Sequence, residues 1–301
     1  MFYEKRPQLF QNYHHTRNHF LAHPNQLEEL EFYATRLVNE ILCQNYAEFE
    51  RDYNEASYLN ALWSNYPPDE RGRSPVGDQI PWIEVGEHAI GHKLSRLISE
   101  KYHIEEVGLP SGADNRFVLY SDEISQITQG ETDCIFVFLD IKSVGPRDNF
   151  DHIVISPYQA SGDGLWDSPE HNMVNTPVLA QGERASHLFY PAISPIYPLT
   201  NEHTTPVVHL FVKPIYTMLN STAPARQGQP LESVKTVCVP NGLLLSVNPN
   251  YLNLFPGLFF PGKDDRNKSP RKIRVRVSFE KLIQIASWRI SEFSPQLLVT
   301  T

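Results

Sequence analysis

Apolar residues recur at helical spacing in two stretches of the chain. The first begins near Asn25, which can cap a helix together with Glu28 three residues later, a capping-box spacing. Its apolar face is formed by Leu27, Leu30, Ala34, Leu37 and Ile41. The second helix is predicted after Pro81, with Gly86 allowing close packing. Glu87 lies in it among apolar neighbours, so it is either a solvated flank residue or a buried carboxylate that needs a partner or a metal.

Other stretches predict strands. Residues 117–120, 152–156 and 206–212 are short apolar runs, and the uninterrupted run 134–139 is typical of a central strand buried on both faces. From residue 273 to 279 apolar residues alternate with Arg274 and Arg276, which predicts a half-buried strand with both arginines on its open face. A final helix is expected over about residues 280–290.

This order of elements predicts an α/β fold, with a mixed central β-sheet flanked by helices. Proline and glycine are spread over many short turns, which favours one compact domain over residues 1–301. Hydrophobic residues make up 41% of the chain, which excludes a disordered protein. No signal peptide is evident and no apolar run approaches the roughly 20 residues of a membrane helix, so we expect a soluble cytoplasmic protein. The three scattered cysteines form no CxxC pair and support neither a disulfide framework nor a cysteine zinc site.

The net charge of −9 argues at first against a nucleic-acid partner, because phosphate binding needs a positive field. The charge is unevenly distributed, however. Residues 261–290 contain nine basic and three acidic residues and so carry +6, which leaves −15 for the rest of the chain. A basic segment of this kind can bind DNA even in an acidic protein.

The segment FVFLDIKSVGPRD, residues 136–148, holds the most informative chemistry. Alternation along a buried strand places Asp140 and Lys142 side by side on one face. Asp114 comes just before the strand at 117–120, and it would meet Asp140 if the two strands form a hairpin. Two carboxylates brought together repel each other unless a cation such as Mg²⁺ neutralises them. The group is therefore either a structural ion pair or the equipment for metal-dependent phosphodiester hydrolysis.

Asp114, Asp140 and Lys142 resemble the PD-(D/E)xK nuclease signature, although alanine stands at position 113 in place of its proline. Four longer segments resemble type II restriction endonucleases of the BglI type: NYPPDERGRSPVGDQIPWIEVGE (65–87), DIKSVGPRD (140–148), PVVHLFVKPIY (206–216) and PGKDDRNKS (261–269). The resemblance extends over nearly the whole chain.

The resemblance implies a homodimeric Mg²⁺-dependent enzyme that cuts double-stranded DNA at GCCNNNNNGGC or a close relative, leaving 5′-phosphate and 3′-hydroxyl ends. It implies that Asp114, Asp140 and the carbonyl of Ile141 bind the metal, and that Lys142 assists the attacking water. Glu87, within the matching WIEVGE segment, is a weaker candidate for supporting the metal site. The catalytic core would cover about residues 80–160. The host would need a cognate DNA methyltransferase, which need not be a physical partner.

Reading a G·C-rich site requires donors for guanine and acceptors for cytosine, which arginine or lysine and aspartate supply. The resemblance assigns this role to Asp148, Lys263, Asp265, Arg274 and Arg276, with the base-reading segment at about 261–280.

Two other functions stay open: a nuclease with the same core and another target, such as a repair nuclease, and a DNA-binding module with an inert catalytic core. His15, His19 and His23 would align on one helix face, but no cysteine or carboxylate joins them at suitable sequence spacing, so a polar surface is favoured over a metal site.

Overall fold

The computed structural model describes residues 5–58, 86–108, 112–143, 150–199, 203–217, 230–262 and 272–295. The elements in the first half of the chain are α1 (Arg6–Ala22), α2 (Pro24–Gln44), α3 (Tyr46–Tyr58), η2 (Glu87–His92), α6 (Lys93–Lys101), β1 (His103–Glu106), β2 (Asn115–Tyr120), α7 (Asp122–Ile127) and β3 (Cys134–Ile141). The middle of the chain forms β4 (His152–Ile155), η3 (Pro157–Gln159), β5 (Val178–Gln181), β6 (Ser186–Phe189), β7 (Ile196–Pro198) and β8 (Thr204–Tyr216). The remaining elements are β9 (Leu231–Val239), η5 (Leu243–Val247), α8 (Tyr251–Leu254), β10 (Phe259–Pro261), β11 (Val275–Ser278), α9 (Phe279–Ile285), η7 (Ser287–Arg289) and β12 (Ile290–Phe293).

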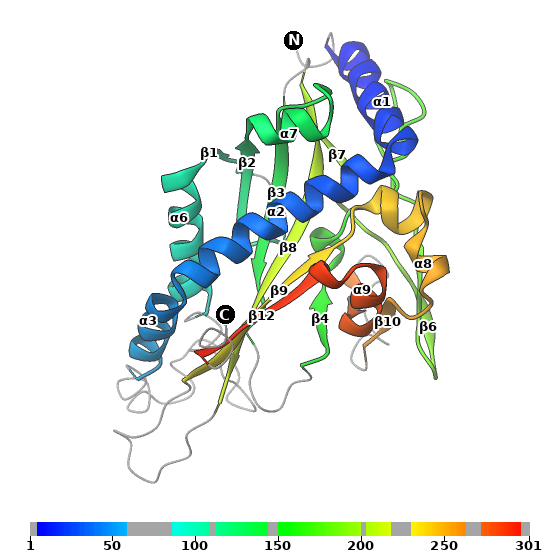
Figure 1. Ribbon diagram of the computed structural model, residues 1–301. Coiled ribbons are helices and arrows are strands. Elements are labelled where there is room, and N and C mark those ends of the chain that lie inside the picture. The colour runs from blue at the N-terminus through cyan, green and yellow to red at the C-terminus, as the bar shows by residue number, and fades with distance from the viewer. Residues whose placement is uncertain are drawn as a thin grey trace, which may run out of the picture.

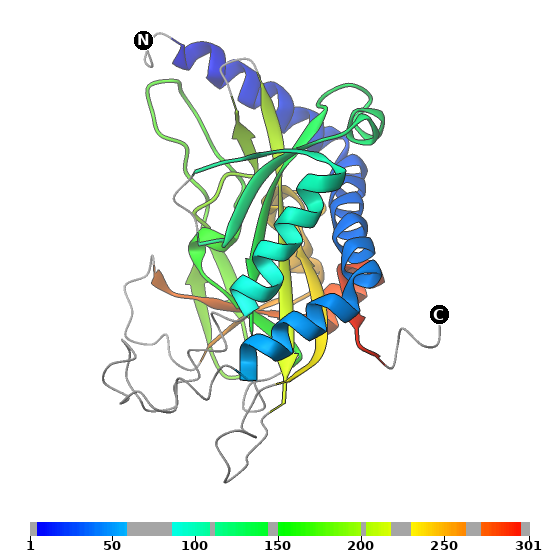
Figure 2. The same ribbon diagram turned by 90° about the vertical axis from the view of Figure 1, so that its left-hand side faces the viewer.

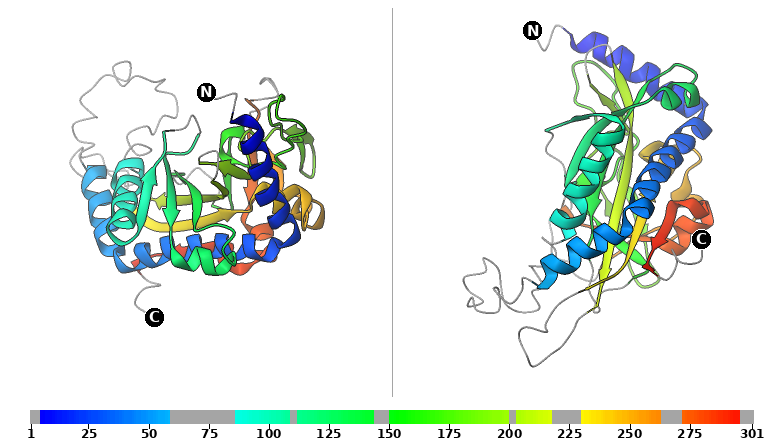
Figure 3. Two further views of the ribbon diagram at one scale, coloured as in Figure 1. Left: turned by 90° about the horizontal axis from the view of Figure 1, so that it is seen from above. Right: turned by 60° about the vertical axis from the view of Figure 1, so that its left-hand side comes forward.

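A seven-stranded sheet forms the centre of the molecule, with the strand order β1-β2-β3-β8-β9-β12 and β7 added beside β8. The β3–β8 pair is parallel and the other pairs are antiparallel, so the predicted mixed sheet is confirmed. All eight residues of β3 are buried, which agrees with the apolar run that predicted it. Helix α2 crosses one face of this sheet (Figure 1). Seen from above, α7 lies along the same side (Figure 3, left).

Side chains of β3 alternate between two hydrophobic clusters. Ile135, Val137, Leu139 and Ile141 belong to the large cluster that includes the buried face of α2. Phe136 and Phe138 belong to a smaller cluster on the opposite face. The next even-numbered position is Asp140, so the charged end of β3 faces away from α2.

The predicted first helix is α2, but the predicted cap is wrong. The helix begins at Pro24 with His23 as its N-cap residue, and no side chain caps it. Proline favours the first helical position because its φ is already helical and the missing N–H would have no partner there. Asn25 therefore lies inside the first turn and not at the cap.

The predicted second helix is described from Gly86 onward and consists of η2 and α6. It approaches the end of β3 closely: a Cβ atom on Gly86 would lie 1.9 Å from Oγ of Ser143, and one on Gly91 would lie 2.9 Å from Cγ1 of Ile141. This confirms the expected close packing at Gly86. Its start after Pro81 lies outside the described residues.

A second sheet, of order β10-β11-β4, lies on the other side of the central sheet from α2 (Figure 2). The predicted helix over 280–290 is wrong at its C-terminal end. Helix α9 ends at Ile285 because Ala286 adopts extended backbone, and Ile290 begins β12, which pairs with Val237 of β9. Within the described ranges, no helix is both long and apolar enough to cross a membrane.

Candidate active site

Two aspartates meet where β2 begins and β3 ends. The antiparallel register pairs Asn115 with Leu139, so Asp114 lies opposite Asp140. Oδ2 of Asp114 accepts a hydrogen bond of 2.6 Å from the backbone N–H of Ile141. The hairpin pairing inferred from the sequence is therefore confirmed.

Lys142 forms an ion pair with Asp140, with 2.5 Å between Nζ and Oδ2. Its backbone N–H donates to the carbonyl of Val212 at 2.8 Å, which holds the segment against β8. The side chain of Asp140 is 4% exposed and that of Lys142 is 24% exposed. The lysine thus reaches from a buried carboxylate toward solvent, where a substrate could contact it.

Gln159 is a member of this site that the sequence analysis missed. Its Nε2 donates to Oδ1 of Asp140 and to the carbonyl of Gly112, both at 2.7 Å. Its Oε1 accepts from the N–H of Ser156 at 2.9 Å, within a capping box formed by the sequence Ser-Pro-Tyr-Gln. That capping-box spacing was visible in the sequence and could have located the turn, but not its contact with Asp140.

The electrostatic environment of Asp140 disfavours its charge when no cation is present. Burial raises the pKa of Asp140 to about 6; Lys142 opposes this shift, and the nearby Asp114 adds to it. A cation at this position would favour the ionised carboxylate. Two carboxylates are suitable ligands for Mg²⁺. The backbone carbonyl of Ile141 could be a third ligand. The N–H and C=O of a strand residue project to the same side, and the N–H of Ile141 donates to Asp114, so its carbonyl projects toward Asp114 as well.

Glu87 is half-buried in the first turn of η2. The close approach of Gly86 and Gly91 to Ser143 and Ile141 places this π-helix beside the end of β3. Asp140 and Lys142 are thus in direct contact, and Asp114 is joined to the same strand end through the N–H of Ile141. The Glu87 segment lies beside them.

The strand predicted to read bases is β11, although it begins at Val275, and Arg274 precedes it. Val275 and Val277 are buried, Arg276 is half-buried and Arg274 is exposed, which confirms the predicted alternation. Nη1 of Arg276 donates to the carbonyl of Pro261 at 3.2 Å. Three further residues predicted to contact DNA lie outside the described residues: Asp148, Lys263 and Asp265.

The histidines of α1 are joined by a carboxylate that sequence spacing did not reveal. Nε2 of His15 lies 3.2 Å, and Nδ1 of His19 3.8 Å, from Oε2 of Glu131. His23 instead contacts the carbonyl of His19, at 3.0 Å. No carboxylate lies at suitable sequence spacing, but Glu131, distant in sequence, supplies one in space.

A second cluster of side chains with possible metal-ligand atoms lies at the opposite end of β3 from Asp140 and consists of Asp133, Cys134 and His203. Nε2 of His203 is 3.3 Å from Oδ1 of Asp133 and 3.7 Å from Sγ of Cys134. Burial raises the pKa of Cys134 to about 11, so the thiol keeps its proton at neutral pH when no cation is bound.

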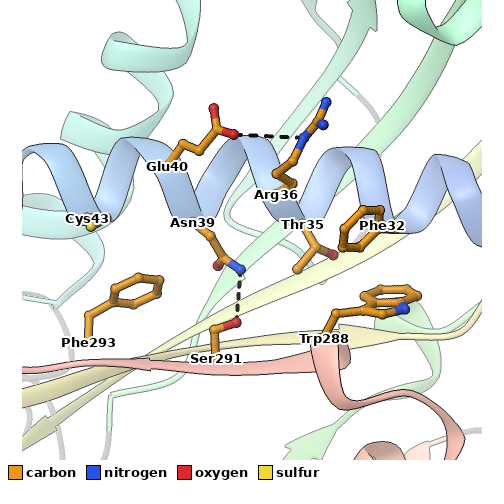
Figure 4. Close-up of a pocket in the computed structure, with 9 residues that line it drawn as sticks. All are labelled: Phe32, Thr35, Arg36, Asn39, Glu40, Cys43, Trp288, Ser291 and Phe293. Atoms are coloured by element: carbon orange, nitrogen blue, oxygen red, sulfur yellow. Dashed lines mark hydrogen bonds and ion pairs between the residues drawn. The ribbon is translucent and has the colours of Figure 1, made fainter. Parts of the chain in front are cut away.

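A pocket of about 390 Å³ lies between α2 and the edge strand β12 (Figure 4). Its one lining carboxylate, Glu40, is ion-paired with Arg36 at 3.8 Å, and Asn39 donates to Ser291 at 2.9 Å. The pocket lies at the far edge of the sheet from β2 and lacks the paired carboxylates found there.

Known proteins resemble this chain over nearly its full length. Residues 26–293 match the family model of the type II restriction enzyme SfiI. The type II restriction enzyme BglI of Bacillus subtilis is 46% identical over 284 residues, which cover 93% of this chain and 95% of that protein. The crystal structure of the restriction endonuclease BglI bound to its DNA recognition sequence has a TM-score of 0.90 and 44% identity, covering 98% of this chain and 99% of that one.

The crystal structure of the tetrameric restriction endonuclease SfiI bound to cognate DNA has a TM-score of 0.60, covering 90% of this chain and 85% of that one. Its identity is 15%, so this similarity concerns the fold. The family match and the 46% identity both extend over most of the sequence. The chain therefore belongs to the SfiI family of type II restriction enzymes, which are site-specific deoxyribonucleases.

Proposed function

We propose that this enzyme hydrolyses both strands of duplex DNA in a Mg²⁺-dependent reaction at an interrupted G·C-rich palindrome, GCCNNNNNGGC or a close relative. The observation that carries the chemistry is the convergence of three side chains at the end of β3: Asp140 is ion-paired with Lys142, and Asp114 accepts from the N–H of the intervening Ile141. The similarity to BglI, whose crystal structure contains its DNA recognition sequence, supports the choice of substrate.

Asp114, Asp140 and the Ile141 carbonyl would hold the cation, and Glu87 would support this site from η2. The bound Mg²⁺ would supply positive charge that stabilises the phosphate in the transition state. Gln159 holds Oδ1 of Asp140 and Lys142 contacts Oδ2, so the carboxylate is kept in one orientation, in which it would serve as a metal ligand.

Lys142 would orient the attacking water through its ammonium group, next to the scissile phosphate. The water oxygen forms a bond to phosphorus as the bond from phosphorus to the 3′ oxygen breaks in line. The 3′ oxygen gains a proton and the water loses one, which leaves 5′-phosphate and 3′-hydroxyl ends.

Bases would be read by β11 of the second sheet and by the residues that precede this strand in sequence, together with Asp148. Arg274 and Arg276 would donate to guanine, together with Lys263, while Asp148 and Asp265 would accept from cytosine N4. A palindromic site has two-fold symmetry, so we propose a homodimer in which each subunit reads one half-site and cuts one strand.

The test is digestion of a fully sequenced plasmid with purified enzyme in Mg²⁺, in EDTA, and in EDTA followed by excess Mg²⁺. We expect discrete fragments only when Mg²⁺ is present, with every mapped end inside a GCC/GGC interrupted palindrome. Discrete cutting elsewhere would overturn the proposed specificity. A smear would indicate a non-specific nuclease, and specific binding without any cleavage would indicate an inert DNA-binding module.

A further inference from the structure

Arg276 is held by a histidine from the neighbouring strand. Strands β11 and β4 pair antiparallel, with Ser278 opposite His152. Nε of Arg276 donates to Nε2 of His152 at 3.1 Å. With the bond to Pro261, two of the five guanidinium N–H groups of Arg276 are used within the protein.

The contacts of His152 define which of its ring nitrogens carries the proton. A guanidinium can only donate, so Nε2 of His152 must be the acceptor. The ring proton is then on Nδ1, which lies 2.8 Å from Oδ1 of Asp151 and donates to it. The Asp151 carboxylate thus fixes the tautomer that Arg276 requires, as carboxylates do for many functional histidines.

His152 is also tied to the central sheet. Nζ of Lys213, a residue that is 1% exposed, donates to the backbone carbonyl of His152 at 2.6 Å. Lys213 follows Val212, whose carbonyl accepts the N–H of Lys142. A short chain of contacts therefore connects the predicted catalytic lysine to the predicted base-reading arginine.

We propose that His152 is a positioning residue for base recognition: neutral His152, held by Asp151 and Lys213, orients the guanidinium of Arg276 toward guanine. This inference rests on the proposed role of Arg276 in reading DNA. His152 itself does not contact the base. Removing its acceptor nitrogen leaves the guanidinium with the bond from Nη1 to Pro261 but without the bond at Nε, so its orientation is less restricted. Discrimination at the base pair read by Arg276 then falls while the other base pairs are still read.

The geometry also predicts how acid acts on recognition. Burial is the largest influence on His152 and lowers its pKa, Asp151 raises it, and the nearby Arg276 and Lys213 lower it. The rings of His152 and Phe260, a residue of β10, form a T-shaped contact with 5.4 Å between their centroids. At neutral pH the ring is therefore uncharged. A proton added at lower pH occupies Nε2, abolishes the bond to Arg276 and places two like charges together.

The test measures kcat/KM on the mapped wild-type site and on duplexes that each change one specified base pair. We expect His152→Leu to reduce discrimination roughly 10- to 100-fold, the range of one hydrogen bond to a charged group, and only at the base pair where Arg276→Ala also reduces it. His152→Gln, whose amide oxygen can replace Nε2, should restore most of it. In the Arg276→Ala background, His152→Leu should cause no further loss of discrimination.

A pH series separates positioning from a purely structural effect. Wild-type discrimination should decline as the pH falls, whereas His152→Gln should lose this dependence because its amide does not titrate. His171→Leu, in an exposed histidine of the loop after Trp166, is the matched control and should behave as wild type in both assays.

Additive effects of His152→Leu and Arg276→Ala, an equal loss at every base pair, or no loss would each overturn the inference. Failure of the wild type to cut at a discrete site would instead refute the proposed function. Thermal melts of each variant identify any that fail to fold, and His152→Gln then decides the question.

Discussion

Gln159 offers a direct way to test the geometry around Asp140. Replacing it with leucine keeps the side-chain size but removes three hydrogen bonds, to Asp140, Gly112 and Ser156. The contact with Asp140 is the functional one, because it fixes one oxygen of the carboxylate beside Lys142. A hydrogen bond to a charged group contributes about 1.5–3 kcal/mol, so its loss corresponds to a roughly 10- to 100-fold fall in the cleavage rate.

The assay is single-turnover cleavage of the wild-type site over a range of Mg²⁺ concentrations. We expect Gln159→Leu to cut more slowly at saturating Mg²⁺ and to need more Mg²⁺ for half-maximal rate, since a loose carboxylate holds a cation less well. DNA binding in Ca²⁺ should be affected much less. Gln126→Leu, in an exposed glutamine of α7, is the matched control and should cut as wild type does.

A wild-type rate and a wild-type Mg²⁺ requirement for folded Gln159→Leu would show that Gln159 does not position Asp140 for catalysis. Thermal denaturation has to accompany the assay, because the backbone groups of Gly112 and Ser156 also lose their partner. A variant that melts well below the assay temperature is replaced by Gln159→Glu. This variant keeps the acceptor for Ser156 but offers Asp140 a second negative charge in place of a donor, and it should cut more slowly still.

Three further outcomes follow from the structure. His209 is fully buried and its pKa is lowered to about 3, so below pH 6.5 the unfolded chain binds this proton before the folded chain does. The free energy of unfolding therefore falls by about 2 kcal/mol by pH 5. His209→Leu should remove that part of the acid destabilisation, which denaturant titrations at pH 7 and 5 would measure. Arg289→Met should destabilise the protein by about 3–5 kcal/mol in the same titrations, because it leaves the buried Glu31 without its 2.8 Å partner. Gly91→Ala should displace Ile141 and lower the cleavage rate more than DNA binding, and an unchanged rate would contradict the close approach seen there.

The strands and helices that were predicted correctly have strong local patterns. The uninterrupted apolar run gave β3, and the alternation around Arg276 gave β11. Strands β9 and β12 were not predicted: β9 contains three valines that could have indicated it, whereas β12 has only four residues. Residues 286–290 were assigned to a helix, yet the burial of Arg289 against Glu31 and the pairing of Ile290 with Val237 determine their conformation. Such long-range contacts override local propensity.

In the candidate site, too, local patterns predicted some residues, whereas long-range contacts determined others. Asp140 and Lys142 could be placed on one face by strand alternation alone, and Asp114 could be added through one hairpin. The contacts of Gln159 and His152 could not be predicted, because each depends on the packing of segments distant in sequence. Charge shows the same limit: the net value of −9 suggested no DNA partner, whereas the distribution of charge along the chain indicated one.

We propose that Asp114, Asp140 and Lys142 form a metal-dependent catalytic centre that is separate from the residues that would read DNA. Lys142→Ala tests this separation when it is assayed for cleavage in Mg²⁺ and for binding to the mapped wild-type site in Ca²⁺. We expect this variant to lose cleavage by at least about 10²-fold, the lower end of the effect of a positioned acid–base group, and to keep specific binding. Cleavage by Lys142→Ala at the wild-type rate would contradict it.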